Sequence, residues 1–209
     1  MNKTLIIWIG LIAMMVMGAC GPRQEPAHEV DEPTDVLVEE TPYDPVTGLL
    51  VSETHQRFFN NLASLCGQSF EGEQIYRSHH ASGWEDYEMV MHVDVCEEDR
   101  ILIPFHVGDD ESRTWMFLVE EGQLRLRHDH RYPDGTPEDD SLYGGYADDT
   151  GTAFEQHFPA DEFTAEVIDG GEGNVWTIRM DEAMTTFTYR LERDGEKRLR
   201  VDFDLTEPL

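Results

Sequence analysis

The feature that most constrains the fold is an alternation of apolar and polar residues that recurs from residue 69 to residue 205. A period of two is typical of β-strands, because successive side chains of a strand point to opposite faces of its sheet. Turn residues such as Glu121-Gly122 and Asp194-Gly195 separate most of the alternating runs. We predict strands at Ser69–Arg77, Tyr87–Cys96, Ile101–Val107, Thr114–Glu120, Gln123–Arg131, Thr152–Phe158, Phe163–Ile168, Asn174–Met180, Thr185–Glu192 and Arg198–Leu205.

This succession of short strands predicts an all-β domain spanning residues 49–209. Without helical periods between the runs, the strands form an antiparallel meander that is closed as a barrel or folded as a sandwich. One short helix precedes them, because Phe58, Phe59, Leu62 and Leu65 have the spacing of a single helical face. Ser52 is the expected N-cap of this helix.

A helix, a strand containing Phe70-Glu71-Gly72 and then a long antiparallel meander together resemble the calycin architecture of lipocalins and fatty-acid-binding proteins. The tryptophan that lipocalins usually carry in their first strand is absent. The stretches Ile103–Asp110, Ser112–Trp115, His128–Arg131, Asp134-Gly135 and Tyr143–Gly145 also resemble a group of uncharacterised bacterial secreted proteins. The second resemblance covers the chain from Leu62 onward and implies a related fold without implying an activity.

The N-terminus has the pattern of an export signal. Leu5 to Met17 is apolar apart from Gly10, but about thirteen residues at 1.5 Å each make ~20 Å, too short for a ~30 Å bilayer core. Met17-Gly18-Ala19-Cys20 resembles the lipobox of bacterial lipoproteins, which implies that residues 1–19 are a signal peptide and that Cys20 is lipidated. The resemblance implies a lipid-anchored protein of the cell envelope, and Gly21 favours the outer membrane.

Residues 20–48 are predicted to be a tether between this anchor and the folded domain. Five prolines and eight acidic residues lie in this stretch, and Arg23 is its only lysine or arginine. Proline disfavours both helix and sheet, and like charges repel, so the segment is expected to be extended.

Charge excludes one class of partner. The chain has 15 Lys and Arg against 44 Asp and Glu, a formal net charge of −29 without a basic cluster. Nucleic acids and anionic membrane surfaces require cations to neutralise phosphates, so we expect no nucleic-acid binding and membrane contact only through the N-terminal lipid. The remaining partners are a small apolar ligand or another envelope protein.

Cys66 and Cys96 are the cysteines left once Cys20 is assigned to lipid. A pair of cysteines in an exported domain predicts a disulfide between them, with two separately buried thiols as the alternative.

The histidines allow two interpretations. His128 and His130 are two residues apart on a predicted strand and therefore share a face, where His106 or His92 from a neighbouring strand could complete a metal site. The alternatives are structural hydrogen bonds inside the barrel and acid–base catalysis. The sequence identifies no cofactor.

Candidate ligand-binding residues surround one acidic turn and one long loop. Asp109, Asp110 and Glu111 precede Arg113 and Trp115, and the turn is either a cation loop or a solvated hairpin in which Arg113 forms a local ion pair. The segment 132–150 is the longest stretch without periodicity, and its Tyr143 and Tyr146 are predicted to cover a barrel mouth.

No nucleophile elbow, phosphate loop or dinucleotide fingerprint occurs in the sequence, and Ser141 has no evident base. We therefore expect non-catalytic binding of a small molecule or partner, with a metal-dependent enzyme or metal carrier built on His128 and His130 as the rival function.

Overall fold

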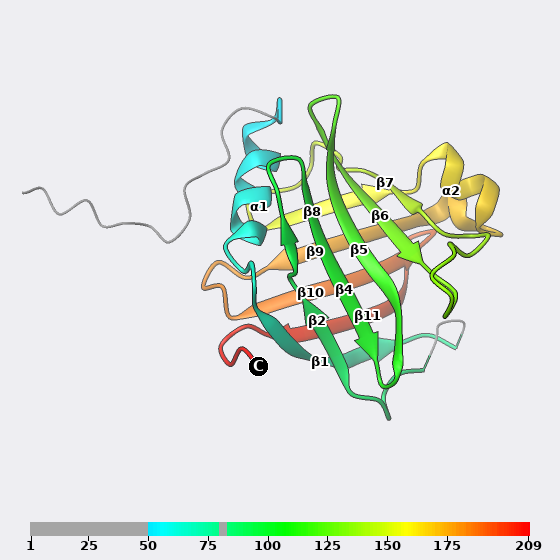
Figure 1. The fold of residues 1–209 in the computed structure, drawn as a ribbon. Helices are drawn as coiled ribbons and strands as arrows, with labels where there is room; N and C mark the ends of the chain where they lie inside the picture. The colour runs from blue at the N-terminus through cyan, green and yellow to red at the C-terminus, as the bar shows by residue number, and fades with distance from the viewer. Residues whose placement is uncertain (1–49, 80–82) are drawn as a thin grey trace, which may run out of the picture. The chain divides into compact units, whose positions relative to one another are not determined.

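The domain is one antiparallel sheet of eleven strands that curls into a nearly closed barrel (Figure 1). The computed structural model describes residues 50–79 and 83–209, so the predicted signal peptide, Cys20 and the tether lie outside the described residues. The strand order is β7-β6-β5-β4-β2-β1-β11-β10-β9-β8, with β3 paired to β4. The all-β prediction is confirmed, and the sheet forms a barrel rather than a sandwich.

The strands are β1 (Ser69–Arg77), β2 (Met89–His92), β3 (Val95–Cys96), β4 (Arg100–Val107), β5 (Asp110–Glu120), β6 (Gln123–His130), β7 (Tyr143–Tyr146), β8 (Glu155–Pro159), β9 (Asn174–Met180), β10 (Thr186–Arg193) and β11 (Glu196–Asp204). The helices are α1 (Glu53–Ala63), α2 (Glu162–Val167) and a short 3-10 turn, η1 (Gly171–Gly173). The first strand, β1, pairs with the last, β11, so the two free edges belong to β7 and β8.

Gly145 allows these free edges to approach each other, and Gly144 allows a close approach between β7 and its neighbour β6. A Cβ on Gly145 would lie 1.8 Å from the carbonyl oxygen of Pro159, at the end of β8. Gly144 has a φ of 153°, and a Cβ there would lie 2.0 Å from the carbonyl oxygen of Leu126 on β6. Only glycine fits at such close approaches. The Gly-Gly pair of β7 therefore sits where the barrel closes.

Helix α1 covers one end of the barrel. Ser52 is its N-cap, as predicted, and the Ser52 hydroxyl accepts a hydrogen bond from the backbone N–H of His55 at 3.3 Å. The Phe58 ring lies 6.3 Å from that of Phe117 on β5, which in turn lies 6.1 Å from Phe158 on β8. We call this end the closed end, because α1 and these buried rings fill it.

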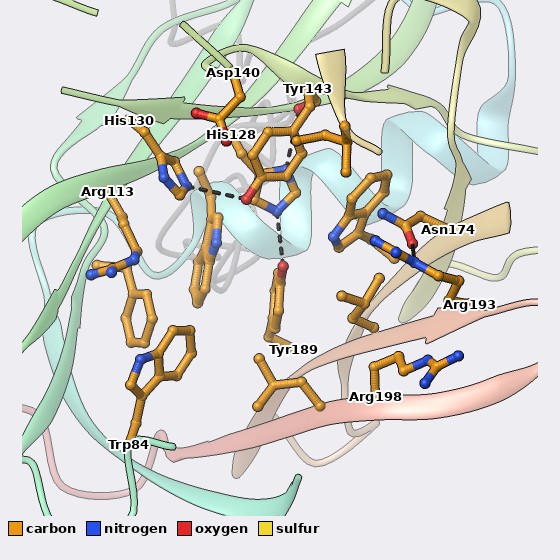
Figure 2. A pocket seen from close by; sticks show the side chains of 16 residues that line it. Trp84, Arg113, His128, His130, Asp140, Tyr143, Asn174, Tyr189, Arg193 and Arg198 are labelled. Atoms are coloured by element: carbon orange, nitrogen blue, oxygen red, sulfur yellow. Dashed lines mark hydrogen bonds between the residues drawn. The ribbon is translucent and has the colours of Figure 1, made fainter. Parts of the chain in front are cut away.

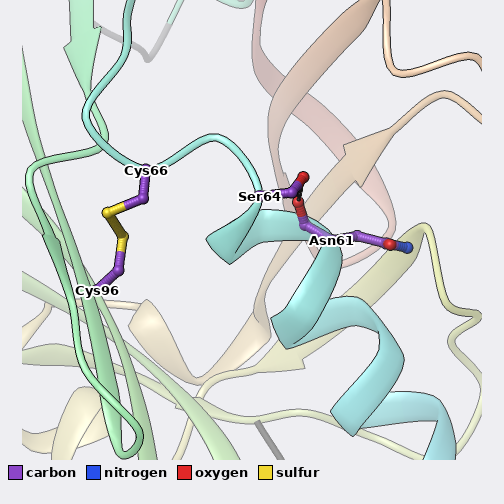
Figure 3. Close-up of a disulfide and its surroundings, with 4 residues drawn as sticks. All are labelled: Asn61, Ser64, Cys66 and Cys96. Atoms are coloured by element: carbon purple, nitrogen blue, oxygen red, sulfur yellow. Dashed lines mark hydrogen bonds between the residues drawn. A yellow bond between two sulfur atoms is a disulfide. The ribbon is translucent and has the colours of Figure 1, made fainter. Parts of the chain in front are cut away.

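The predicted disulfide is present. Cys66, just after α1, is bonded to Cys96 at the end of β3, with 6.2 Å between their Cα atoms (Figure 3). It ties the segment that leaves α1 to the sheet at the closed end, where β3 pairs with the beginning of β4.

Two strand predictions and one loop prediction need correction. The run Phe163–Ile168 is not a strand, because Asp161 caps helix α2 there by accepting a hydrogen bond from the Thr164 backbone N–H at 3.0 Å. A six-residue run is too short for its period to distinguish helix from strand. The run Tyr87–Cys96 is divided into β2 and β3, and the predicted loop 132–150 contains β7.

None of the helices within the described ranges is long and apolar enough to span a membrane.

Candidate functional site

A cavity of about 570 Å³ lies inside the barrel at the end opposite α1 (Figure 2). We call this end the open end. Its wall comes from the end of β4, the beginnings of β5, β7 and β9, the end of β6, the β10–β11 hairpin and the loop between β1 and β2. Its aromatic lining consists of Trp84, Phe105, Trp115, Tyr143, Trp176 and Tyr189, and its charged lining consists of Arg113, Asp140, Arg193 and Arg198.

Alternation along the strands places the inner residues. Trp115 on β5 pairs in register with His128 on β6, and both face the barrel interior. Tyr189 on β10 reaches the same space from the other wall, and its ring stacks on Trp115 with 4.7 Å between centroids and an 8° interplanar angle. Side chains from opposite walls therefore meet beneath the cavity, as expected for a small barrel.

His128 is a neutral, fully hydrogen-bonded histidine. Its Nδ1 lies 3.3 Å from the carbonyl oxygen of Tyr143, which can only accept, so Nδ1 carries the proton. Its Nε2 then accepts a hydrogen bond from the Tyr189 hydroxyl at 3.0 Å. Burial, with a smaller effect from His130, lowers the pKa of His128 to about 3, so the ring stays uncharged at neutral pH.

The neighbouring tyrosines are held in their neutral forms as well. Burial is the main cause that raises the pKa of both Tyr143 and Tyr189. The Tyr143 hydroxyl lies 3.1 Å from Nε2 of His130, whose pKa is lowered, first by burial and then by the charge of Arg113. This network lines the cavity with oriented but uncharged polar groups, which suits binding and orientation more than proton transfer at neutral pH.

The structure does not bring the three predicted metal ligands together. His106 on β4 points to the outer face of the barrel, where its Nδ1 lies 3.2 Å from Nε2 of His92. His92 in turn lies 2.7 Å from the Ser69 hydroxyl. Within residues 50–79 and 83–209, no group of three histidine, cysteine or acidic side chains is arranged to hold a metal ion.

The two tyrosines that were predicted to cover the barrel mouth lie on different faces of β7. Tyr143 lines the cavity, whereas Tyr146, three residues along the same strand, lies on the outer face. There the Arg125 guanidinium lies 4.7 Å from the centre of the Tyr146 ring, and the Tyr146 hydroxyl donates to Glu120 at 3.2 Å. Tyr146 therefore belongs to an outer ion-pair cluster and not to the site.

Arg113 and Trp115, two of the candidate ligand-binding residues, both line the cavity. Arg113 forms the local ion pair with Asp110 at 2.7 Å, and its guanidinium lies 5.4 Å from the centre of the Trp84 ring. The acidic turn is therefore a hairpin stabilised by its own arginine. Ser141 donates a hydrogen bond to Asp129 at 3.0 Å and accepts one from the His130 backbone N–H at 2.8 Å, contacts that fix the loop before β7.

Sequence reasoning missed several wall residues, chiefly Trp84, Asn174, Trp176, Arg193 and Arg198. They come from segments far apart in the chain, and a barrel must close before they share a wall. The one available signal was the basic pair at the ends of the β10–β11 hairpin, since Arg193 and Arg198 flank the turn at Asp194-Gly195.

Trp176 and Arg198 both line this cavity, and each carries a buried N–H donor without a hydrogen-bond acceptor in the described residues. The indole N–H of Trp176 acts to lower the pKa of Tyr189 against the dominant effect of burial, but it does not reach hydrogen-bond geometry.

Comparison of the chain with protein-family models, with curated proteins and with solved structures gave no match. A possible function must therefore be argued from the cavity itself.

Proposed function

We propose that this is a lipid-anchored protein of the cell envelope whose barrel binds a small molecule without transforming it. The observation that carries the proposal is the cavity of about 570 Å³ at the open end, where aromatic rings and polar side chains line the same wall. Small-molecule sites typically have volumes of about 300–1,000 Å³ and this kind of lining. The neutral His128–Tyr189 pair supplies fixed polar groups at its base.

The rival function, metal binding through His128 and His130, receives less support from the geometry. The one nitrogen lone pair of His128 accepts the Tyr189 hydroxyl proton, and its other nitrogen donates to a carbonyl. A metal ion would have to displace Tyr189, whose ring is stacked on Trp115. His106, the third predicted ligand, lies on the other face of the sheet.

A structural or assembly role without a small ligand is the third possibility, and the cavity argues against it. A barrel that served only as a scaffold would gain stability from filling its interior with side chains. Here the closed end is filled, whereas the open end keeps a space bordered by tryptophan and tyrosine rings.

Native mass spectrometry of the full chain tests the binding function. We expect a bound small molecule to co-purify with the wild-type chain. Leu191 borders the cavity, so Leu191→Trp would place an indole in that space and should remove the extra mass. Ile75→Trp, at a position 49% exposed on β1, is the matched control and should retain the bound molecule. A ligand retained equally in both variants would place binding elsewhere.

The anchor is a separate part of the proposal and rests on the sequence Met17-Gly18-Ala19-Cys20. Cys20→Ser should abolish labelling by a radioactive fatty acid and release the chain from membranes, because acyl chains at ~0.8 kcal/mol per buried methylene would hold it there. Labelling that survives the substitution would contradict the anchor while leaving the cavity's function untouched.

A further inference from the structure

The wall of the cavity has the opposite charge balance to the rest of the chain. The full chain has 15 basic against 44 acidic residues, yet the charged side chains of the cavity wall are three arginines and one aspartate. We propose that the cavity binds a small planar organic anion. This inference rests on the proposed binding function and adds the charge and the shape of the ligand.

Arg193 is the arginine best placed to receive the acid group. Its Nε donates to the side-chain oxygen of Asn174 at 2.7 Å, and its Nη1 donates to the carbonyl oxygen of Asp169 at 3.3 Å. Asn174 is buried and begins β9, so it holds the guanidinium in one orientation. These contacts position Arg193 without neutralising it.

The other two arginines of the wall already have acidic partners. Arg113 pairs with Asp110 at 2.7 Å, and Arg198 pairs with Glu196 at 3.3 Å. Arg193 forms no ion pair with a carboxylate anywhere in the part of the chain that the structure describes. Figure 2 shows Arg193 and Arg198 together on one side of the cavity, with Arg113 and Trp84 on the other. A ligand carboxylate, sulfonate or phosphate would therefore lie on the Arg193 side.

Unpaired donors on the same wall point to a ligand rich in acceptors. Trp176 is 1% exposed, and its indole N–H has no acceptor among residues 50–79 and 83–209. The Nε–H of Arg198 is buried and equally unpaired within those ranges. Both groups can only donate, and a buried donor without an acceptor costs about 1–3 kcal/mol. Anionic oxygens would satisfy them, and hydrogen bonds to an ionised acceptor are the stronger kind.

The rest of the wall determines the shape. Trp84, Phe105, Trp115 and Tyr189 present rings, and the Phe105 ring is itself stacked on Trp115 with 4.7 Å between centroids. Aromatic side chains pair best with other flat ring systems, face to face with an offset or edge to face. A planar body with an acid group at one end therefore matches both the aromatic wall and the arginine side.

The test compares two dyes with the same fused rings, one anionic (anilinonaphthalene sulfonate) and one neutral (phenylnaphthylamine). Binding is measured by fluorescence on the full chain carrying Cys20→Ser, so that no acyl chain competes for the cavity. We expect Arg193→Gln to weaken binding of the sulfonate dye about tenfold or more. Binding of the neutral dye should weaken by less than about twofold, since only the anion loses a charge-assisted contact. Arg193→Lys retains the charge and should recover part of the affinity.

Two controls make the outcomes decisive. Arg57→Gln removes the same charge from α1 at the closed end and should change neither dye by more than about twofold, because that position is solvated and far from the wall. Leu191→Trp should abolish binding of both dyes. Equal losses of both dyes in Arg193→Gln, or equal affinities in the wild type, would overturn the anion inference and leave the binding function standing. Dye binding that is unchanged in Leu191→Trp, or no binding of either dye, would overturn both the anion inference and the binding function.

Discussion

The two ends of the barrel are built from the same strands but differ in what fills them. At the closed end, Phe58 of α1, Phe117 and Phe158 are completely buried, and a disulfide ties the segment after α1 to the sheet. At the open end the same sheet leaves a cavity bordered by arginines, histidines and unpaired donors. The closed end therefore supplies folding free energy, whereas the open end retains polar groups that a tightly filled core would not contain.

The largest expected effect comes from opening a hole at the closed end. Phe117 is fully buried between Phe58 and Phe158, so Phe117→Ala should lower the free energy of unfolding by about 3–5 kcal/mol, measured by urea denaturation. Leu199→Ala is the partner variant at the open end, where the removed atoms border existing space, and it should cost less. An equal or larger loss at Leu199 would contradict the division between the two ends.

Breaking the disulfide should have the next largest effect. Cys66 and Cys96 are 30 residues apart, which corresponds to about 3.6 kcal/mol in the loop-entropy model, an upper guide to the loss. Reductant, or the double substitution Cys66→Ser and Cys96→Ser, should lower the melting temperature without abolishing dye binding at the open end. Two cysteines that alkylate freely in the native, unreduced protein would refute the bond.

The free energy of unfolding should depend on pH through His128 at the open end. Burial holds the pKa of His128 at about 3 in the folded state, against an ordinary value of 6.5. As pH falls, the unfolded chain therefore binds this proton before the folded chain does. The stability that depends on a neutral His128 is fully present above about pH 6.5 and is lost as pH falls towards 3. Between pH 7.5 and pH 4 the loss amounts to about 3 kcal/mol, from ~1.4 kcal/mol per unit.

His128→Gln tests this because glutamine cannot take up the proton. The difference in free energy of unfolding between wild type and variant should shrink as pH falls from 7 to 4, measured by urea denaturation at each pH. His92 and His130, whose pKa values are also lowered by burial, remain in both proteins and cancel in the difference. A difference that stays constant with pH would show that His128 is not held neutral.

Sequence reasoning succeeded where a signal is local. Alternation placed His128 and His130 on one face of β6, where both line the cavity, because a strand's period is independent of its partners. The N-cap Ser52 and helix α1 likewise depend on a few adjacent residues. The disulfide followed from the cysteine count together with the predicted export signal, since Cys20 was assigned elsewhere.

The site was less predictable because it depends on closure of the sheet. Trp115, Arg113 and Tyr143 were named as candidates, but Trp84 lies in the β1–β2 loop and Arg193 at the end of β10, far from them in the chain. Trp84 is held at the wall by a hydrogen bond from its backbone N–H to the Gln74 side chain at 2.9 Å. The spacing of residues in the sequence does not predict this contact. The Phe163–Ile168 error has a different cause, since the cap at Asp161 decided between two periods that six residues cannot separate.

The smallest expected effect concerns the helix of the closed end. Ser52→Ala removes the side-chain acceptor of the His55 N–H and should lower the free energy of unfolding by about 1 kcal/mol. The loss stays modest because Phe58, Phe59 and Leu62, all fully buried, hold α1 on the barrel whether or not its first turn is capped.

Ser64→Ala at the other end of α1 is the matched control. The Ser64 hydroxyl is exposed and donates to the Asn61 carbonyl at 2.6 Å, which water can replace, so this substitution should stay within about 0.5 kcal/mol of wild type. If Ser52→Ala instead cost as much as Phe117→Ala, the closed end would depend on helix nucleation as well as on apolar burial. The closed and open ends would then differ in local helix stability as well as in what fills them.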